Sequence, residues 1–273
     1  MNKVVLITGA TKNTGYATAK RFAKEGWNVC VTSRDDKGAQ EAATRLQTEY
    51  PDVKIEGIAY EQSNVENIRA GFRRVKKLFG RLDAFIPNAA HLAVGLDSLT
   101  TTPEQWDEVM NANLRGTFFG CQEAAKLMVE NDGGAIAVVS SVHANQSIPG
   151  RVAYSASKAG LNAMVRCMAV EMGHLHIRVN SLIAGAIWTE RWLSQTPEQT
   201  QKRRDQYPAG KESAPEDIAS ALYFLCSDQS PTITGTELTV DSGISICLLP
   251  YNCLLYTSPS PRDRTRSRMP SSA

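Results

Sequence analysis

Short apolar runs alternate with helix-patterned segments through residue 240, and this alternation constrains the fold more than any other feature. Each run has the length of a buried strand, and each intervening segment is long enough for a helix. Strands joined by such helices form a parallel sheet covered on both faces, because the crossovers are right-handed. The sequence therefore predicts an α/β fold with a doubly wound parallel sheet of seven strands, at about residues 4–8, 29–32, 53–58, 82–86, 135–139, 177–183 and 237–240.

Several helix starts can be predicted from side chains that cap free backbone N–H groups. Ser63 followed by Glu66 is a capping-box pattern that predicts a helix beginning at this serine. Thr102, Pro103 and Gln105 predict another helix start, with proline at the first helical position. A long helix is predicted over residues 152–172.

The segment from Cys253 to Ala273 differs in composition from the rest of the chain, with Pro, Ser and Arg dominating. Its beginning, CLLYTSPSPRD, and its end, SRMPSSA, match what one reading frame of a sequencing adapter encodes. We hypothesise that adapter read-through replaced the natural sequence after about Asn252; the alternatives are a disordered tail and a basic interaction arm. Residues 1–252 are then expected to form a single domain, and residues 253–273 a disordered, non-native tail.

Composition excludes several classes of protein. The C-terminal segment holds four arginines and one aspartate. Without it, the 30 basic and 28 acidic residues become 26 and 27, which is a net charge of −1. The rest of the chain is therefore near neutral, and no nucleic-acid partner is expected. No apolar stretch has the length of a membrane span or a signal peptide, which favours a cytoplasmic protein. The six cysteines show no CxxC pair, so neither a metal site nor disulfides are expected; they are Cys30, Cys121, Cys167, Cys226, Cys247 and Cys253.

A glycine-containing turn, residues 8–15, joins the first predicted strand to the first helix. Such a turn lets backbone N–H groups and the helix N-terminus face a phosphate. An ordinary strand-to-helix loop is the alternative, but the position at the first crossover favours phosphate binding.

Two further signals suit acid–base chemistry. Tyr154 and Lys158 stand four residues apart and so share one helix face. A neighbouring ammonium favours the phenolate, so Lys158 is expected to lower the tyrosine pKa. Ser140 and Ser141 end the fifth predicted strand, where a hydroxyl can bind a substrate oxygen. Each signal alone is more often structural, as a surface pair of a helix or a turn serine.

Together these motifs resemble those of the short-chain dehydrogenase/reductase family over about residues 3–248. The matching features, in the order and spacing of that family, are the 8–15 turn, Asn88-Ala89-Ala90, Asn113, Ser141, Tyr154 and Lys158. The resemblance implies a Rossmann-like, dinucleotide-binding catalytic domain that transfers hydride between nicotinamide and a carbonyl or alcohol substrate. It also implies a homotetramer or homodimer assembled through helices around residues 104–130 and 152–172.

The resemblance also implies residue roles. Tyr154 would be the general acid–base, Lys158 would lower its pKa and bind the nicotinamide ribose, Ser141 would hold the reacting oxygen, and Asn113 would anchor a water for proton relay. The implied cofactor-binding residues are Gly9, Thr11, Lys12, Asn13, Thr14, Gly15, Ser33, Arg34, Glu61, Asn88, Ala89, Tyr154, Lys158, Gly185, Ile187 and Thr189. Asn13 and Glu61 depart from the family pattern, where a glycine and an aspartate are usual; Asn tolerates a left-handed backbone, so a small effect is expected.

The choice between the two nicotinamide cofactors depends on charge after the second strand. Family members that use NAD usually carry an acid at the place of Ser33. Here Arg34 follows, and Lys12 lies in the glycine turn, so the sequence favours NADP(H), with NAD(H) as the alternative. Asp35 and Asp36 come next and weaken that preference.

The substrate is left open, because the pocket is built from loops. His91 and His143 are candidates for its lining, although a structural role is favoured for both. Trp188 and Trp192 fall in or beside the irregular stretch 190–212, which in the family is a mobile substrate lid. The candidate activities are a 3-oxoacyl thioester (acyl-carrier-protein) reductase and a sugar, polyol or steroid dehydrogenase. A non-catalytic NAD(P)-binding sensor is the alternative from another class, and the intact Ser-Tyr-Lys-Asn set disfavours it.

Overall fold

The structure is a computed structural model that describes residues 2–248, so the predicted tail from Cys253 and its boundary at Asn252 lie outside the described residues. Seven parallel strands form one sheet in the order β3-β2-β1-β4-β5-β6-β7, which confirms the predicted doubly wound fold. The order reverses between β1 and β4, the position where such folds bind ligands. The strands are β1 (Val4–Ile7), β2 (Asn28–Ser33), β3 (Ile55–Ala59), β4 (Ala84–Ile86), β5 (Gly134–Ser141), β6 (Ile177–Ala184) and β7 (Glu237–Val240).

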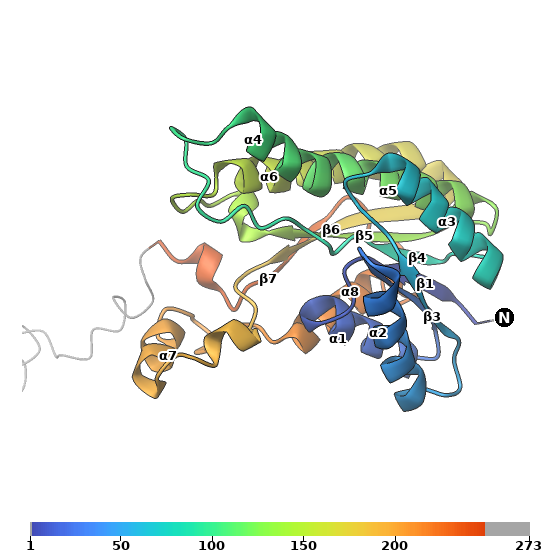
Figure 1. Cartoon of the computed structure of the whole chain (residues 1–273), viewed down its shortest axis with the longest axis horizontal. Coiled ribbons are helices and arrows are strands. Elements are labelled where there is room, and N and C mark those ends of the chain that lie inside the picture. The colour runs from blue at the N-terminus through green and yellow to red at the C-terminus, as the bar shows by residue number, and fades with distance from the viewer. Residues whose placement is uncertain (1, 249–273) are drawn as a thin grey trace, which may run out of the picture.

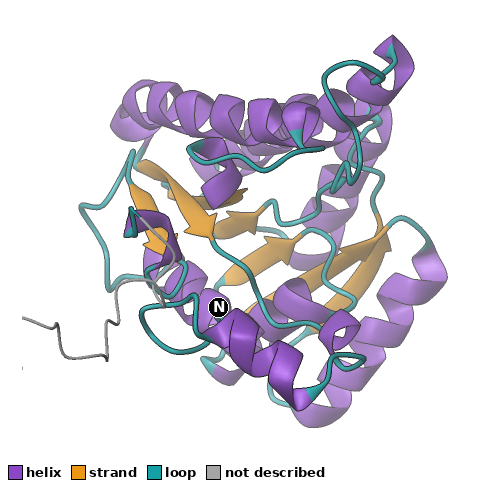
Figure 2. Cartoon of the chain, turned by 90° about the vertical axis from the view of Figure 1, so that its left-hand side faces the viewer, coloured by secondary structure: helices purple, strands orange, loops and turns teal. Residues whose placement is uncertain are grey.

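Helices cover both faces of this sheet. One layer holds α1, α2 and α8, and the other holds α3, α4, α5 and α6 (Figure 1). Figure 2 shows the strands between the two helical layers. The helices are α1 (Asn13–Lys24), α2 (Asp36–Glu49), α3 (Val65–Phe79), α4 (Pro103–Met110), α5 (Gly116–Val129), α6 (Val152–Met172), α7 (Pro197–Arg204) and α8 (Pro215–Cys226).

Strand β1 shows why the strands read as continuous apolar runs. Val5 and Ile7 pack against α1, α2 and α8, whereas Val4 and Leu6 pack into the core beneath α3, α5 and α6. All four side chains are buried. Both faces of a doubly covered sheet require apolar residues, so no polar alternation appears in the strand.

Two predictions about helices need correction. Helix α3 begins after Asn64, whose side chain accepts a hydrogen bond from Asn67 N at 3.0 Å, and Ser63 is therefore not the cap. The Ser63 hydroxyl instead donates to Glu61 at 2.9 Å. The 190–212 stretch is not wholly irregular, because it contains α7, which a Thr196 capping box begins. The predicted start at Thr102, with a capping box and Pro at the first position, is confirmed.

Within residues 2–248, no helix is long and apolar enough to cross a membrane. The same part of the chain contains no group of acidic, His or Cys side chains that could hold a metal ion. The five cysteines described there are free thiols.

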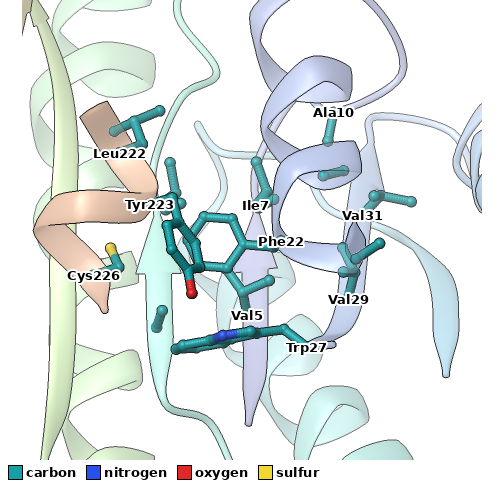
Figure 3. Packing of buried hydrophobic residues seen from close by; sticks show 14 of the residues in the cluster. Val5, Ile7, Ala10, Phe22, Trp27, Val29, Val31, Leu222, Tyr223 and Cys226 are labelled. Carbon is teal, nitrogen blue, oxygen red and sulfur yellow. The ribbon is translucent and has the colours of Figure 1, made fainter. Parts of the chain in front are cut away.

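An aromatic cluster joins α1 to α8 on one face of the sheet (Figure 3). The ring of Phe22 meets that of Trp27 edge-on at 5.1 Å and that of Tyr223 at 5.2 Å. Phe22 is fully buried at the centre of this cluster. Because α1 begins at the glycine turn, the cluster fixes the helix whose N-terminus faces the candidate site.

Replacing Phe22 by Ala should lower the free energy of unfolding by about 3–5 kcal/mol, because the surrounding rings cannot close the cavity. Urea denaturation followed by circular dichroism measures this. The control is Leu99→Ala, at a side chain that is 97% exposed. It should change stability by no more than about 0.5 kcal/mol. Similar losses in the two variants would contradict this account of the cluster.

Candidate active site

The turn between β1 and α1 is tight and contains left-handed backbone. Gly9 has a φ of +63°, and Asn13 has a φ of +49°, as expected for the residue that replaces a glycine. A Cβ atom on Gly15 would lie only 2.4 Å from the Gly9 carbonyl oxygen. The turn therefore depends on glycine at both ends, while asparagine tolerates the conformation between them.

The N-terminus of α1 has the features of an anion site. Lys12 occupies the N-cap position in extended conformation without a side-chain cap, and no acidic residue lies in the first turn. By contrast, side chains of Asp35, Asn64 and Thr102 cap α2, α3 and α4. The N–H groups and positive dipole end of α1 thus fit the diphosphate of a dinucleotide cofactor.

Asn88 and Ala89, which follow β4, are tied to the end of β1. The Thr8 hydroxyl accepts hydrogen bonds from the backbone N–H groups of Asn88 at 3.0 Å and Ala89 at 2.9 Å. In return, Asn88 Nδ2 donates to the carbonyls of Thr8 and Gly9. The structure therefore brings both predicted cofactor residues against the glycine turn.

The predicted catalytic residues Ser141, Tyr154 and Lys158 come together at the carboxyl end of β5. Ser141 is the last residue of that strand, and the other two lie on adjacent turns of α6. The Ser141 side chain lies close enough to the Tyr154 hydroxyl to lower its pKa. Lys158 Nζ donates to the Val139 carbonyl at 2.8 Å and lies 5.5 Å from the centre of the Tyr154 ring. All three side chains are buried.

The pKa values in this cluster depend mainly on burial. Burial raises the pKa of Tyr154, and the Ser141 side chain and the Arg151 charge offset this only in part. The net direction of the Tyr154 pKa is therefore upward, opposite to what the spacing with Lys158 predicts. The lowering of this pKa by Lys158 stays a prediction. Burial also lowers the pKa of Lys158 itself to about 8, because the charged form loses its hydration.

Asn113 lies in a π-helical stretch, Asn111–Arg115, between α4 and α5. Its side chain accepts a hydrogen bond from His91 N at 2.7 Å and donates to the His91 carbonyl at 2.9 Å and to Ser157 Oγ at 3.1 Å. The bond to Ser157 holds Asn113 next to α6, on which Ser157 lies three residues after Tyr154. A π-helical bulge is frequent at functional sites.

The histidine candidates lie at the edge of this cluster. The His143 ring meets the Tyr154 ring edge-on at 5.8 Å, and burial lowers the pKa of His143. His91 contacts Asn113 through its backbone, and its Nε2 lies 3.5 Å from a Glu108 carboxylate oxygen. The proximity of His143 to Tyr154 supports the suggestion that it lines the substrate pocket.

The remaining predicted cofactor residues follow β3 and β6. Glu61 accepts hydrogen bonds from the backbone N–H and the hydroxyl of Ser63, so its carboxylate is already engaged locally. Gly185 packs so closely on Asp241 that a Cβ would lie 2.6 Å away. Ile187 bridges to the backbone of Ser213. The Thr189 hydroxyl is buried without a hydrogen-bond partner among the described residues, which fits a contact to a bound cofactor.

The acids after β2 have partners of their own. Asp35 caps α2 by accepting from Gly38 N at 2.7 Å, and this bond holds the Asp35 pKa below its usual value. The hydroxyl of Ser33 also donates to this carboxylate at 3.2 Å. Asp36 pairs with Arg74 at 3.0 Å. Arg34 and Lys12 are both exposed.

Sequence reasoning missed two residues at the site. Arg151 lies with its guanidinium 5.7 Å from the centre of the Tyr154 ring and donates to the Leu92 carbonyl. Its position three residues before Tyr154, about one helical turn away, was the signal that could have indicated this contact.

Gln62 is buried between the glycine turn and the π-helical stretch. Nothing in the sequence pattern marks it, since a single glutamine after a strand is ordinarily exposed.

Comparisons with known proteins show what this chain is similar to. The family model described as enoyl-(acyl carrier protein) reductase matches residues 9–245. A 3alpha-hydroxysteroid dehydrogenase of Mediterraneibacter gnavus is 32% identical, and the alignment covers 88% of this chain and 96% of that protein. The 3-oxoacyl-(acyl-carrier-protein) reductase FabG of Aquifex aeolicus is 31% identical, with 89% and 97% covered. The crystal structure of a levodione reductase has a TM-score of 0.83 and 28% identity, with 90% of this chain and 98% of that chain covered.

The fold and the site together define an oxidoreductase that uses a nicotinamide dinucleotide. More specifically, the chain belongs to the short-chain dehydrogenase/reductase family. It is an NAD(P)-dependent enzyme that transfers hydride between the nicotinamide and a CH–OH or C=O group.

The buried ammonium of Lys158 gives a pH dependence that can be measured as stability. Folding lowers its pKa from 10.5 to about 8, so between these values the unfolded chain binds more protons than the folded chain. Stability should therefore rise with pH across this window, by about 3 kcal/mol. Lys158→Met removes the titrating group.

Urea denaturation of both proteins between pH 7 and pH 10.5 checks this prediction. The difference in unfolding free energy, wild type minus Lys158→Met, cancels the contributions of other titrating groups and should increase with pH. A flat or falling difference would show that Lys158 keeps its ordinary pKa.

Proposed function

We propose that Tyr154 is the general acid–base of this enzyme and that Ser141 holds the reacting oxygen. The closeness of these two side chains carries the proposal: Ser141 ends β5, Tyr154 lies on α6, and Ser141 interacts with the phenol in a way that lowers its pKa. One substrate oxygen can then meet both O–H donors. Tyr154 gives its proton to that oxygen in reduction and takes it back in oxidation. Ser141 stabilises the negative charge that develops on the oxygen. The nicotinamide cofactor supplies or accepts the hydride.

Lys158 and Asn113 complete the proposed catalytic set. An ammonium has three donors, and the bond to Val139 uses one of those of Lys158. We propose that the others bind the ribose of the nicotinamide and stabilise the Tyr154 phenolate. Asn113 anchors the relay that returns the proton to solvent, and its three side-chain hydrogen bonds hold it in place for this role.

We further propose NADP(H) as the preferred cofactor. Arg34 and Lys12 are exposed beside the end of β2 and the glycine turn, and Arg45 donates to the Thr11 carbonyl of the same turn at 3.0 Å. Three cations thus stand near the place where a 2′-phosphate would lie. The acids that follow Arg34 are paired with the α2 N-terminus and with Arg74, so they oppose this phosphate less than their sequence position implied.

We propose a homodimer or homotetramer formed through the helices around residues 104–130, which comprise α4 and α5, and 152–172, which form α6. Exposed apolar side chains on these helices support it: Phe118 and Val129 on α5, and Val170, which is 83% exposed, on α6. Sedimentation analysis that returns a monomer would overturn this.

We also propose a cytoplasmic location, because free thiols suit a reducing compartment. Recovery of the protein in a secreted fraction would contradict this location.

We propose that residues 1–252 form one catalytic domain and that the segment from Cys253 is encoded by sequencing-adapter DNA. The change in composition at this point supports the proposal. Resequencing the locus from intact DNA tests it, and a genomic reading frame that encodes the same segment would overturn it.

Replacing Tyr154 by Phe should abolish turnover while the cofactor still binds, because the variant lacks only the hydroxyl group that carries the transferable proton. The assay follows reduced-cofactor absorbance over a panel of ketones, 3-oxoacyl thioesters, sugars and steroids, and cofactor binding is measured by fluorescence titration. Full activity in the variant would eliminate the proposed role. Cofactor binding without any turnover by the wild type would favour a non-catalytic sensor.

Arg34→Gln should raise the KM for NADPH by about 10-fold or more and leave that for NADH nearly unchanged, because a charge-assisted bond to the 2′-phosphate is lost. The matched control is Arg73→Gln, at an exposed position on α3. It should alter neither constant. Equal effects on NADPH and NADH would contradict the proposed preference.

A further inference from the structure

Gln62 is a buried polar side chain, 6% exposed, that follows β3 and contacts three other segments. Its Nε2 donates to the carbonyls of Ala89 at 3.0 Å and Ala112 at 2.8 Å, and to the Thr117 hydroxyl at 3.2 Å. Its Oε1 accepts from the Thr8 hydroxyl at 3.2 Å. The two carbonyls can only accept, so the atom that faces them must be the amide nitrogen.

Each of these contacts leads to a residue of the proposed site. The Thr8 hydroxyl holds the backbone N–H groups of Asn88 and Ala89, and it gives its own proton to Gln62. On the other side, the Thr117 hydroxyl donates to the carbonyl of Asn113 at 2.7 Å. A continuous chain of hydrogen bonds thus runs from the glycine turn through Gln62 to the π-helical stretch.

The backbone of the same residue supports the π-helical stretch. A Cβ on Gly116, where that stretch joins α5, would lie 1.9 Å from the Gln62 carbonyl oxygen. The junction can therefore approach this closely only because it carries a glycine. Both the side chain and the main chain of Gln62 fix the position of the segment that presents Asn113.

We propose that Gln62 is a positioning residue that fixes the cofactor turn at Asn88–Ala89 relative to the π-helical stretch at Asn113. An apolar side chain of the same length would leave the carbonyls of Ala89 and Ala112 without their donor, and the two segments would shift apart. This inference rests on the proposed function, since it assigns Gln62 to the support of Asn113 and of the cofactor turn.

The test compares Gln62→Met with Gln47→Met. Gln47 is a matched control because its amide also links backbone groups, donating to Tyr50 and Val53 and accepting from Ile55, at the opposite edge of the sheet. Gln62→Met should lower kcat by about 10-fold or more, because small misplacements of catalytic groups are costly. It should also weaken NADPH binding, whereas Gln47→Met should leave both values unchanged. Equal loss of kcat in the two variants would reduce Gln62 to a structural role and overturn the proposal.

Thr117→Val provides a second variant that removes only the branch to Asn113. It should lower kcat and raise the solvent deuterium isotope effect on kcat, with NADPH binding unchanged, because the proton relay alone is disturbed. An unchanged kcat and isotope effect would overturn the proposed link to Asn113. This variant decides the question if Gln62→Met does not fold.

Hydrogen exchange separates this inference from the proposed function. Amides of residues 111–117 should lose protection in Gln62→Met but not in Gln47→Met, whether or not a substrate has been found. Unchanged protection would overturn the positioning role. Absence of turnover by the wild type, with protection lost as expected, would instead count against the proposed function alone.

Discussion

The hydrogen bonds of the Thr8 hydroxyl connect the two loops that leave the centre of the sheet. β1 pairs with β2 on one side and β4 on the other, and the chain order reverses between β1 and β4. The loops after these two strands must diverge, yet Thr8 accepts from both N–H groups of the turn after β4. The glycine turn, the cofactor turn and, through Gln62, the π-helical stretch therefore form one connected surface at the carboxyl edge.

Burial dominates the chemistry at this edge. Tyr154 and Lys158 are both removed from water, so each is pushed toward its neutral form: the tyrosine pKa rises and the lysine pKa falls. Ser141 and Arg151 act in the opposite sense on the tyrosine. Together they offset desolvation only in part, so the neutral phenol is the favoured form of Tyr154 in this structure.

The sequence predicted the fold well because strand and helix signals are local. Periodicity located all seven strands, and the Thr102 capping box located a helix start to the residue. The capping-box pattern predicted the wrong start at Ser63, because Asn64 caps the helix and the Ser63 hydroxyl donates to Glu61 instead. The π-helical stretch and the partners of Gln62 were not predictable, because they depend on contacts between residues about 27 to 55 positions apart in the chain. The direction of the Tyr154 pKa depends on burial, which the i, i+4 spacing does not reveal.

The measurement that tests the central claim most directly is a crystal structure of the protein with NADP(H) bound. The account predicts the diphosphate at the N-terminus of α1, within about 3 Å of its first N–H groups, and a ribose hydroxyl beside Lys158 Nζ. It also predicts the 2′-phosphate against Arg34 and a hydrogen bond to the Thr189 hydroxyl, which is unpartnered among the described residues. A nucleotide bound elsewhere, or one that leaves Tyr154 remote from the nicotinamide, would contradict the account.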